Sequence, residues 1–277
     1  MFKKFPFIGQ GRPLISVIRL NGIISSGTAR SGLSINSLSK NFDQAFKQKG
    51  LKAVALDINS PGGSPVQSSL IYKYIRRLSS EKKIPVFSFV QDVAASGGYW
   101  LACTGDEIFA DSNSIIGSIG VISGGFGFKE LIKKIGIERR MYTSGEQKSF
   151  LDPFLPEKQS DVDHLKSLQE EIHSEFKNLV RERRKNKLSK EENKLFTGQF
   201  WTGNKALELG LIDGIGDINT VMKNRYGEKV RFRIFDNDKS WIRRKFGLGY
   251  AFNNRYQWSN DIIYSIESRL LWSRFGL

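Results

Sequence analysis

Runs of apolar, β-branched residues alternate along this chain with segments whose apolar residues recur at helical spacing. Strand-like runs occupy residues 14–24, 52–58 and 84–90, and helical patterns occupy residues 35–50 and 66–80. Because the strand-like runs are nearly continuously apolar, they fit strands that are buried on both faces. The alternation predicts an α/β fold with a mostly parallel sheet that is covered by helices on both sides.

The second half of the chain carries a longer amphipathic pattern. Apolar residues recur at helical spacing from Val162 to Leu179, which predicts a helix over residues 156–186 that serves in oligomerisation or as a lid. On these patterns the chain divides into a basic, aromatic segment (1–13), a main domain (14–236) and a basic, aromatic tail (237–277). Further strands are expected at residues 107–111, 118–123, 138–144 and 230–236.

Charge and composition limit the class of protein. The formal net charge is +15, but the basic residues are spread out and accompany no nucleic-acid-binding motif, so we expect no nucleic-acid partner. The single cysteine, Cys103, excludes an intrachain disulfide and a thiolate metal cluster. No stretch reaches the ~18 apolar residues of a membrane span, and Pro6 and Gly9 interrupt the apolar start that a signal peptide needs. We therefore expect a cytoplasmic or membrane-associated protein without a transmembrane helix.

A loop of small residues holds the first candidate for catalysis. In QDVAASGGYWLACTG, Gln91 to Gly105, Ser96 follows a predicted strand and opens a predicted helix. The helix N-terminus would lie near its hydroxyl, and Gly97 and Gly98 let a ligand approach the backbone closely. This arrangement is like a nucleophile elbow. The alternative, which the loop alone favours, is that Ser96 only caps the helix.

A second glycine-rich loop, NSPGGS at residues 59–64, also follows a strand. Two glycines in this place can present backbone N–H groups to an anion, and an oxyanion hole for acyl transfer needs two such donors. Gly63 would supply one donor and Gly97 the other, since sites in parallel sheets form at the carboxyl ends of the strands. The alternative is an ordinary turn.

A nucleophilic serine also needs a base. The only histidines, His164 and His173, lie nine positions apart on the predicted helix, on opposite faces and among charged residues, so we expect both to be exposed. Lysine is the other candidate, as in Ser-Lys enzymes. Lys148, in TSGEQKSFLDPF, is expected in a loop just after a strand, before an aromatic and apolar stretch that would desolvate it.

Five motifs in order give the chain a resemblance to the signal peptide peptidase A family of serine peptidases, including its SohB-like members. The resemblance covers residues 14–227. Its carriers are LDINSPGG (56–63), VAASGGYWLAC (93–103), SIIGSIGVI (114–122), YTSGEQKSF (142–150) and FTGQFWTGNKALELGLIDGIG (196–216). It implies a ClpP/crotonase-like fold of repeated β-β-α units and a bacterial-type peptidase.

The resemblance also implies roles for particular residues. Ser96 becomes the nucleophile, Lys148 the general base, and Gly63 and Gly97 the oxyanion hole. It implies a homo-oligomer, in which serine and lysine come from one subunit or from neighbours, and it implies no metal or cofactor. The substrates would be cleaved signal peptides and other short or unfolded apolar segments beside the membrane. Residues expected to line the substrate path are Gly62, Gly98, Gly117, Ser118 and Ile119.

Two departures from the family pattern stand out: there is no N-terminal membrane span, and Gln147 replaces a tyrosine before the lysine. The tail from Ser240 lies outside the resemblance, and its basic, aromatic composition suggests a peripheral membrane contact, with an oligomer contact as the alternative. Two rival functions are a crotonase-like acyl-CoA enzyme, which needs no Ser-Lys pair, and a non-catalytic membrane scaffold.

Overall fold

The computed structural model describes residues 12–26, 32–145, 147–189, 192–236, 266 and 268–277. The strands are β1 (Leu14–Asn21), β2 (Leu51–Ser60), β3 (Val86–Ala95), β4 (Glu107–Ala110), β5 (Ile115–Gly117), β6 (Phe200–Thr202), β7 (Gly214–Ile215) and β8 (Arg231–Phe235). The helices are α1 (Ile35–Phe46), α2 (Pro65–Lys82), α3 (Gly97–Ala102), α4 (Lys129–Lys134), α5 (Gln159–Arg184), α6 (Glu192–Leu195), α7 (Gly203–Glu208) and α8 (Ile218–Tyr226), with a 3-10 turn, η1 (Lys185–Lys187), after α5.

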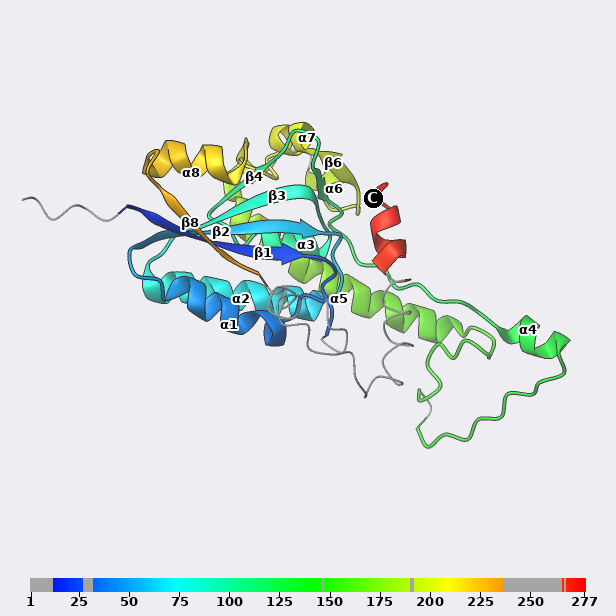
Figure 1. The fold of residues 1–277 in the computed structure, drawn as a ribbon. Coiled ribbons are helices and arrows are strands. Elements are labelled where there is room, and N and C mark those ends of the chain that lie inside the picture. Colours follow the sequence, from blue (N-terminus) through cyan, green and yellow to red (C-terminus); the bar gives the residue numbers. More distant parts are fainter. Residues whose placement is uncertain (1–11, 27–31, 146, 190–191, 237–265, 267) are drawn as a thin grey trace, which may run out of the picture.

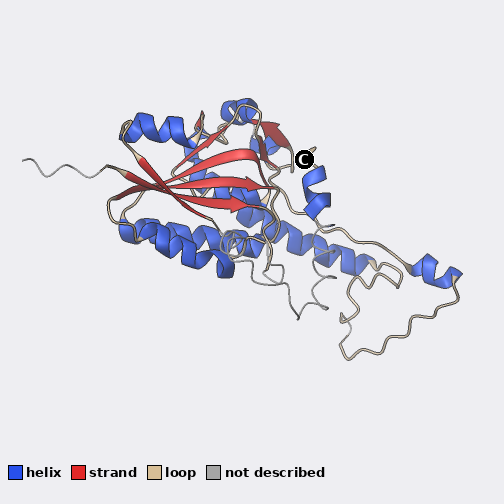
Figure 2. Cartoon of the chain, in the orientation of Figure 1, coloured by secondary structure: helices blue, strands red, loops and turns tan. Residues whose placement is uncertain are grey.

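These strands form one 8-stranded sheet in the order β6-β5-β3-β2-β1-β8, with β4 beside β3 and β7 beside β4. All pairs are parallel except β5 with β6. Helices α1, α2, α3 and α5 cover one face of the sheet and α8 covers the other (Figures 1 and 2). The predicted α/β fold with a mostly parallel, helix-covered sheet is therefore confirmed. No helix among the described residues is both long and apolar enough to cross a membrane.

Two buried layers hold the helices on the sheet. The larger layer joins β1, β2 and β3 to α1, α2, α3 and α5, and includes Phe42, Ile71, Tyr99 and Phe176. The smaller layer packs α8 on the opposite face, against the alternate residues of the same strands. The central strands are covered on both faces, so their side chains are apolar on both faces. This explains the unbroken hydrophobic sequences of these strands.

The third strand is longer than its sequence pattern predicts. We expected it to end at Val90, but β3 continues to Ala95, and its second half pairs with β5 through Val93–Ile115 and Ala95–Gly117. The hydrogen-bonded ladder therefore runs up to the residue before Ser96. Ser96 therefore lies at the carboxyl edge of the sheet, where β2 also ends.

Residues after β5 do not form the predicted strands at 118–123 and 138–144. Residues 121–145 and 147–158 form an arm that leaves the body of the sheet and returns into α5; the one helix among these described residues is the short α4 (Figure 1). The predicted strands are wrong because neither segment pairs with another strand in the described chain. A β-favouring sequence forms a strand only where a partner edge is available.

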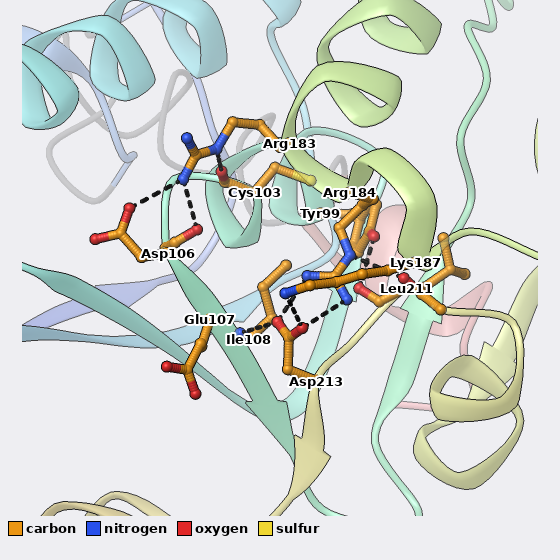
Figure 3. Close-up of polar contacts among 12 residues, drawn as sticks. Tyr99, Cys103, Asp106, Glu107, Ile108, Arg183, Arg184, Lys187, Leu211 and Asp213 are labelled. Carbon is orange, nitrogen blue, oxygen red and sulfur yellow. Dashed lines mark hydrogen bonds and ion pairs between the residues drawn. The ribbon is translucent and has the colours of Figure 1, made fainter.

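Two arginines from different helices hold the turn that ends α3. Arg183 of α5 donates to the carbonyl oxygens of Cys103 (2.9 Å) and Gly105 (2.9 Å) (Figure 3). Arg76 of α2 donates to the carbonyl oxygen of Thr104 at 3.1 Å, and both guanidinium groups reach the Asp106 carboxylate. Positive charge at the carboxyl end of a helix is stabilising. The six residues of α3 are thereby fixed to both long helices.

A buried ion pair lies beside this clamp. Arg184 is 2% exposed and makes a two-pronged contact with Asp213, at 2.7 and 3.1 Å (Figure 3). Asp213 also accepts from the backbone N–H of Ile108 (2.8 Å) and from Lys187 (2.6 Å). Burial alone would raise the pKa of the Asp213 carboxyl, but the hydrogen bonds from Arg184 and Lys187 outweigh it and hold this pKa below its usual value.

We expect the substitution Asp213→Asn to lower the free energy of unfolding by about 3–5 kcal/mol, because it leaves the Arg184 charge buried without its partner. The stabilisation that Asp213 provides is complete above the unfolded carboxyl pKa of about 3.9 and is lost as pH falls through the lower folded value. Urea unfolding of both proteins should therefore give curves that converge below about pH 4. Glu81→Gln, at the exposed Arg77–Glu81 pair, should leave stability essentially unchanged; an equal effect of the two substitutions would contradict the role of the buried pair.

Candidate active site

Ser96 occupies the turn between β3 and α3 in a backbone conformation that side chains rarely adopt, with φ 52° and ψ −122°. Such a conformation costs about 1–3 kcal/mol and persists only where the surroundings hold it. The backbone N–H of Ser96 donates to the carbonyl oxygen of Gly117 at 2.8 Å, and its own carbonyl accepts from Tyr99 (2.9 Å) and Trp100 (3.1 Å). The turn is thus fixed on both sides.

The Ser96 hydroxyl does not cap the helix. Ser96 stands at the N-cap position of α3, yet its side chain accepts no hydrogen bond from the first turn. The side chain is half-buried, and within the described residues its oxygen has no hydrogen-bond partner. The simple capping role that the loop sequence favoured is therefore wrong for the side chain, which leaves the hydroxyl available for chemistry.

The two glycine loops meet at this serine. A Cβ atom placed on Gly97 would lie 3.4 Å from the backbone nitrogen of Gly63, and one placed on Gly62 would lie 2.9 Å from the Ser96 Cβ. Within the described chain, neither the N–H of Gly63 nor that of Gly97 donates to another protein atom. Two unpaired backbone donors beside one hydroxyl form a small site that is suited to an oxygen carrying negative charge.

Ile24 fixes the loop that holds Gly63. Its backbone N–H donates to the carbonyl oxygen of Gly62 at 2.9 Å, and its carbonyl accepts from the N–H of Ser64 at 2.8 Å. A Cβ on Gly63 would stand 2.0 Å from the Ile24 oxygen, and Gly63 has φ +138°, so only glycine fits there. Ile24 could not be recognised from the sequence, because a residue that acts through its backbone carries no side-chain signature.

Of the other residues predicted to line the substrate path, Gly62 and Gly117 contact Ser96, but several of the set are packed into the interior. Gly98 packs against the backbone of Ser60, where a Cβ would lie 2.3 Å from the carbonyl oxygen. Gly117 lies against the ring of Trp201, and Ile119 is fully buried. Ser118 has φ 51°, and its N–H donates to the carbonyl oxygen of Gln199 at 2.7 Å. Close packing is therefore a sufficient reason for Gly98 and Gly117 to be glycine.

Neither histidine lies at Ser96. His164 is exposed, as expected, and makes an edge contact with the ring of Phe150. The expectation that His173 is also exposed is wrong, because it is half-buried and its Nε2 lies 3.1 Å from the carbonyl oxygen of Ile119. The two side chains lie on different faces of α5, and the structure shows no contact between either ring and Ser96 in the part of the chain that it describes.

Lys148 lies on the arm, exposed, in a turn where its N–H donates to the carbonyl oxygen of Gly145 at 3.2 Å. The expected surroundings are wrong in two respects within the described chain: residues 138–145 form no strand before Lys148, and the aromatic stretch after it leaves the side chain exposed. The described residues show no contact between Lys148 and Ser96, which lie on the arm and on the body of the same chain.

Cys103 is excluded as an alternative nucleophile. Its thiol is fully buried at the carboxyl end of α3, and burial raises the pKa of Cys103 to about 11, so the reactive thiolate is scarce at neutral pH. Burial also raises the pKa of Tyr99 well above its usual value, and the phenol donates to the carbonyl oxygen of Leu211 at 2.7 Å.

Among the described residues, no cluster of His, Cys, Asp and Glu side chains could hold a metal ion.

We expect Gly97→Ala to lower the free energy of unfolding by about 1–3 kcal/mol, because its Cβ would lie 2.6 Å from the Ser68 hydroxyl oxygen and 3.1 Å from the Ile24 side chain. Ser68→Ala removes that oxygen, so the double variant should be more stable than the sum of the single effects by at least about 0.5 kcal/mol. Urea unfolding of the four proteins measures this coupling. Gly125→Ala, where a Cβ meets nothing within 4 Å, should be nearly neutral; strict additivity at 68 and 97 would contradict the contact.

The sequence profile of peptidase family S49 matches residues 79–229, which is more than half of the chain. Over 95% of its length the chain is also 47% identical to a Brucella abortus protein named Na(+)/H(+) antiporter NhaA. It covers only 37% of that protein, and the same holds for the Brucella melitensis protein of the same name.

Relatives named as proteases align with this chain over a larger share of their own length. A putative protease of Synechocystis is 35% identical over 88% of this chain and 86% of its own length. A putative signal peptide peptidase SppA of Enterococcus faecium is 31% identical over 80% of this chain and 65% of its own. These matches confirm the resemblance that the five motifs indicated, and the chain belongs to peptidase family S49.

Proposed function

We propose that this chain is the catalytic unit of a serine endopeptidase in which Ser96 is the nucleophile and Lys148, supplied by a second copy of the chain, is the general base. The observation that carries the proposal is the turn at Ser96. A hydroxyl without a hydrogen-bond partner stands on a strained backbone beside two unpaired N–H groups, those of Gly63 and Gly97. Membership of a peptidase family supplies the class of reaction.

The proposed reaction begins when the Ser96 oxygen attacks the scissile carbonyl carbon while a neutral Lys148 amine takes the hydroxyl proton. The carbonyl oxygen becomes an oxyanion, which accepts hydrogen bonds from the N–H groups of Gly63 and Gly97. The C–N bond then breaks, and the leaving amine takes the proton back from Lys148. Water attacks the acyl-enzyme by the same route, which releases the acid and restores Ser96.

A lysine acts as a base only where burial removes water from its amine. Because Lys148 is exposed in the single chain, the proposal places a second copy over the arm. The arm supports this, because its large apolar side chains are mostly uncovered, with Phe126 79% and Tyr142 92% exposed. Exposed apolar surface of this extent marks an interaction site. Packing between copies would cover these side chains and bring Lys148 to a neighbouring Ser96.

The substrates proposed here are short or unfolded apolar peptides, including cleaved signal peptides. The strongest support is the similarity to proteins named signal peptide peptidase, one of which covers 80% of this chain. The acyl-CoA enzyme and the non-catalytic scaffold remain as rivals, and the family match favours a peptidase over both. Hydrolysis of acyl-CoA thioesters without peptide cleavage would favour the first rival.

We expect Ser96→Ala and Lys148→Ala each to lower kcat/KM for a fluorogenic apolar peptide by roughly 10³-fold or more. Wild-type activity should rise with pH, because the base acts in its neutral form. Lys73→Ala and Ser80→Ala, at exposed positions of α2, serve as matched controls and should retain full activity. Unchanged cleavage in both site variants would refute the proposed roles.

Co-expression of the two inactive variants tests the source of the lysine. If Ser96 and Lys148 come from different subunits, mixed oligomers contain sites with an intact serine from one chain and an intact lysine from the other. Peptide cleavage should then reappear, at a fraction of the wild-type rate. Failure of mixed oligomers to recover any activity, with both single variants inactive, would place the two residues in one subunit.

A further inference from the structure

We propose that the amino-terminal edge of the sheet is a docking surface for anionic phospholipid headgroups. This edge lies at the opposite end of the strands from Ser96. It presents a group of exposed cations, here called the basic edge. Its members are Arg12, Lys49, Lys52, Lys229, Arg231 and Arg233.

Strand register brings these distant residues together. Leu14 at the start of β1 lies beside Leu51 of β2 on one side and beside Arg231 of β8 on the other. The backbone N–H of Arg231 also donates to the carbonyl oxygen of Pro13 at 2.8 Å, which fixes the start of β8 next to the start of β1. Since all three strands are parallel, the residues just before and at their starts form one continuous surface.

The charge of the basic edge is not neutralised within the described chain. None of its members forms an ion pair there, and Arg233 donates to the neutral Gln48 side chain at 2.6 Å. Of the carboxylates at the same end of the molecule, four are already paired with other cations, and that of Asp43 accepts from the Tyr74 hydroxyl at 2.9 Å. The four ion pairs are Arg77–Glu81 at 3.1 Å, Arg76–Asp106 at 2.7 Å, Arg225–Glu107 at 2.6 Å and Lys223–Glu228 at 3.4 Å.

Helix ends explain only part of the positive charge at this end. Lys82 and Lys83 stand at the carboxyl end of α2, and Lys47 at that of α1, where cations favourably meet the helix dipole. Members of the basic edge lie on strands β2 and β8 or in the segments that lead into β1, β2 and β8, beyond the last turn of a helix. Their clustering therefore needs another explanation, and an anionic partner supplies it.

The shape and composition of this surface favour lipid over nucleic acid. A groove of about 440 Å³ is lined by Leu14, Gln48, Lys49, Arg231, Phe232 and Arg233, so apolar and cationic groups share it. A phospholipid offers both a phosphate and an adjoining apolar region. In the sequence, residues 1–11 precede Arg12 and contain Lys3, Lys4 and three phenylalanines, a composition typical of segments at membrane interfaces.

Docking through the basic edge would set the direction in which the opposite end of the sheet faces. Strand β2 has 10 residues, so the two ends of the sheet are roughly 30 Å apart at about 3.3 Å per residue. The turn at Ser96 would then face away from the headgroups. Peptides would reach it from the aqueous side, after they have left the bilayer.

Sedimentation of the full chain with vesicles tests this surface. The probes are vesicles of phosphatidylcholine alone and of phosphatidylcholine mixed with phosphatidylglycerol. We expect binding only to the mixed vesicles, weakened by added salt. The triple variant Lys49→Gln/Lys52→Gln/Lys229→Gln should bind roughly 100-fold more weakly at low salt, since each cation near the surface contributes about fivefold or more.

The matched control is Lys40→Gln/Lys73→Gln/Lys166→Gln, which removes the same charge from exposed positions on α1, α2 and α5 and should bind nearly as well as wild type. Circular dichroism of both variants checks that they are folded. Equal loss in the two triple variants would overturn the proposal, since net charge alone would then explain binding. Binding to a duplex oligonucleotide but not to mixed vesicles would overturn it in favour of nucleic acid. Neither result depends on whether Ser96 is catalytic.

Discussion

The turn between β3 and α3 is the constraint on which the rest of the site depends. A serine held at φ 52° stores strain, and a helix of only six residues is too short to hold that strain by itself. The structure supplies the missing support from both sides. The β3–β5 ladder and the carbonyl of Gly117 fix the chain before the turn, and Arg76 and Arg183 fix the carbonyls that follow α3. Arginine side chains that do not contact the Ser96 hydroxyl thus help to hold the turn that positions it.

The position of this turn also requires close packing between the loop after β2 and the start of α3. For two backbone N–H groups to stand beside one hydroxyl, the loop after β2 must touch the start of α3 without intervening side chains. Gly62 and Gly97 allow that approach, and Gly63 allows the contact with Ile24 that holds the loop in place. Each of these contacts involves backbone atoms, so the site is shaped chiefly by the steric limits of the main chain.

Much of this could be predicted from the sequence, and the remainder could not for identifiable reasons. Continuous apolar runs gave the parallel sheet, and glycine loops after two strands indicated where they meet. Periodicity could not show that residues 138–144 lack a strand partner among the described residues, or that the side chain of Lys148 is exposed. Arg183 and Asp213 were not singled out, because a charged residue in a long amphipathic helix or a Gly-rich loop has no local signal of burial. Such positions become visible only when distant segments pack together.

The two ends of the sheet carry different chemistry for the same topological reason. Parallel strands bring all their carboxyl ends to one edge and all their amino ends to the other, so each edge gathers residues that are far apart in sequence. At the carboxyl edge the residues that meet around Ser96 are mostly glycines, which allow backbone segments to approach one another closely. At the amino edge they are basic, and the nearby carboxylates are committed to other partners. The proposed nucleophile turn and the proposed lipid-docking surface would therefore be separated by the length of the strands, so that docking at the amino edge would leave the carboxyl edge open to solvent.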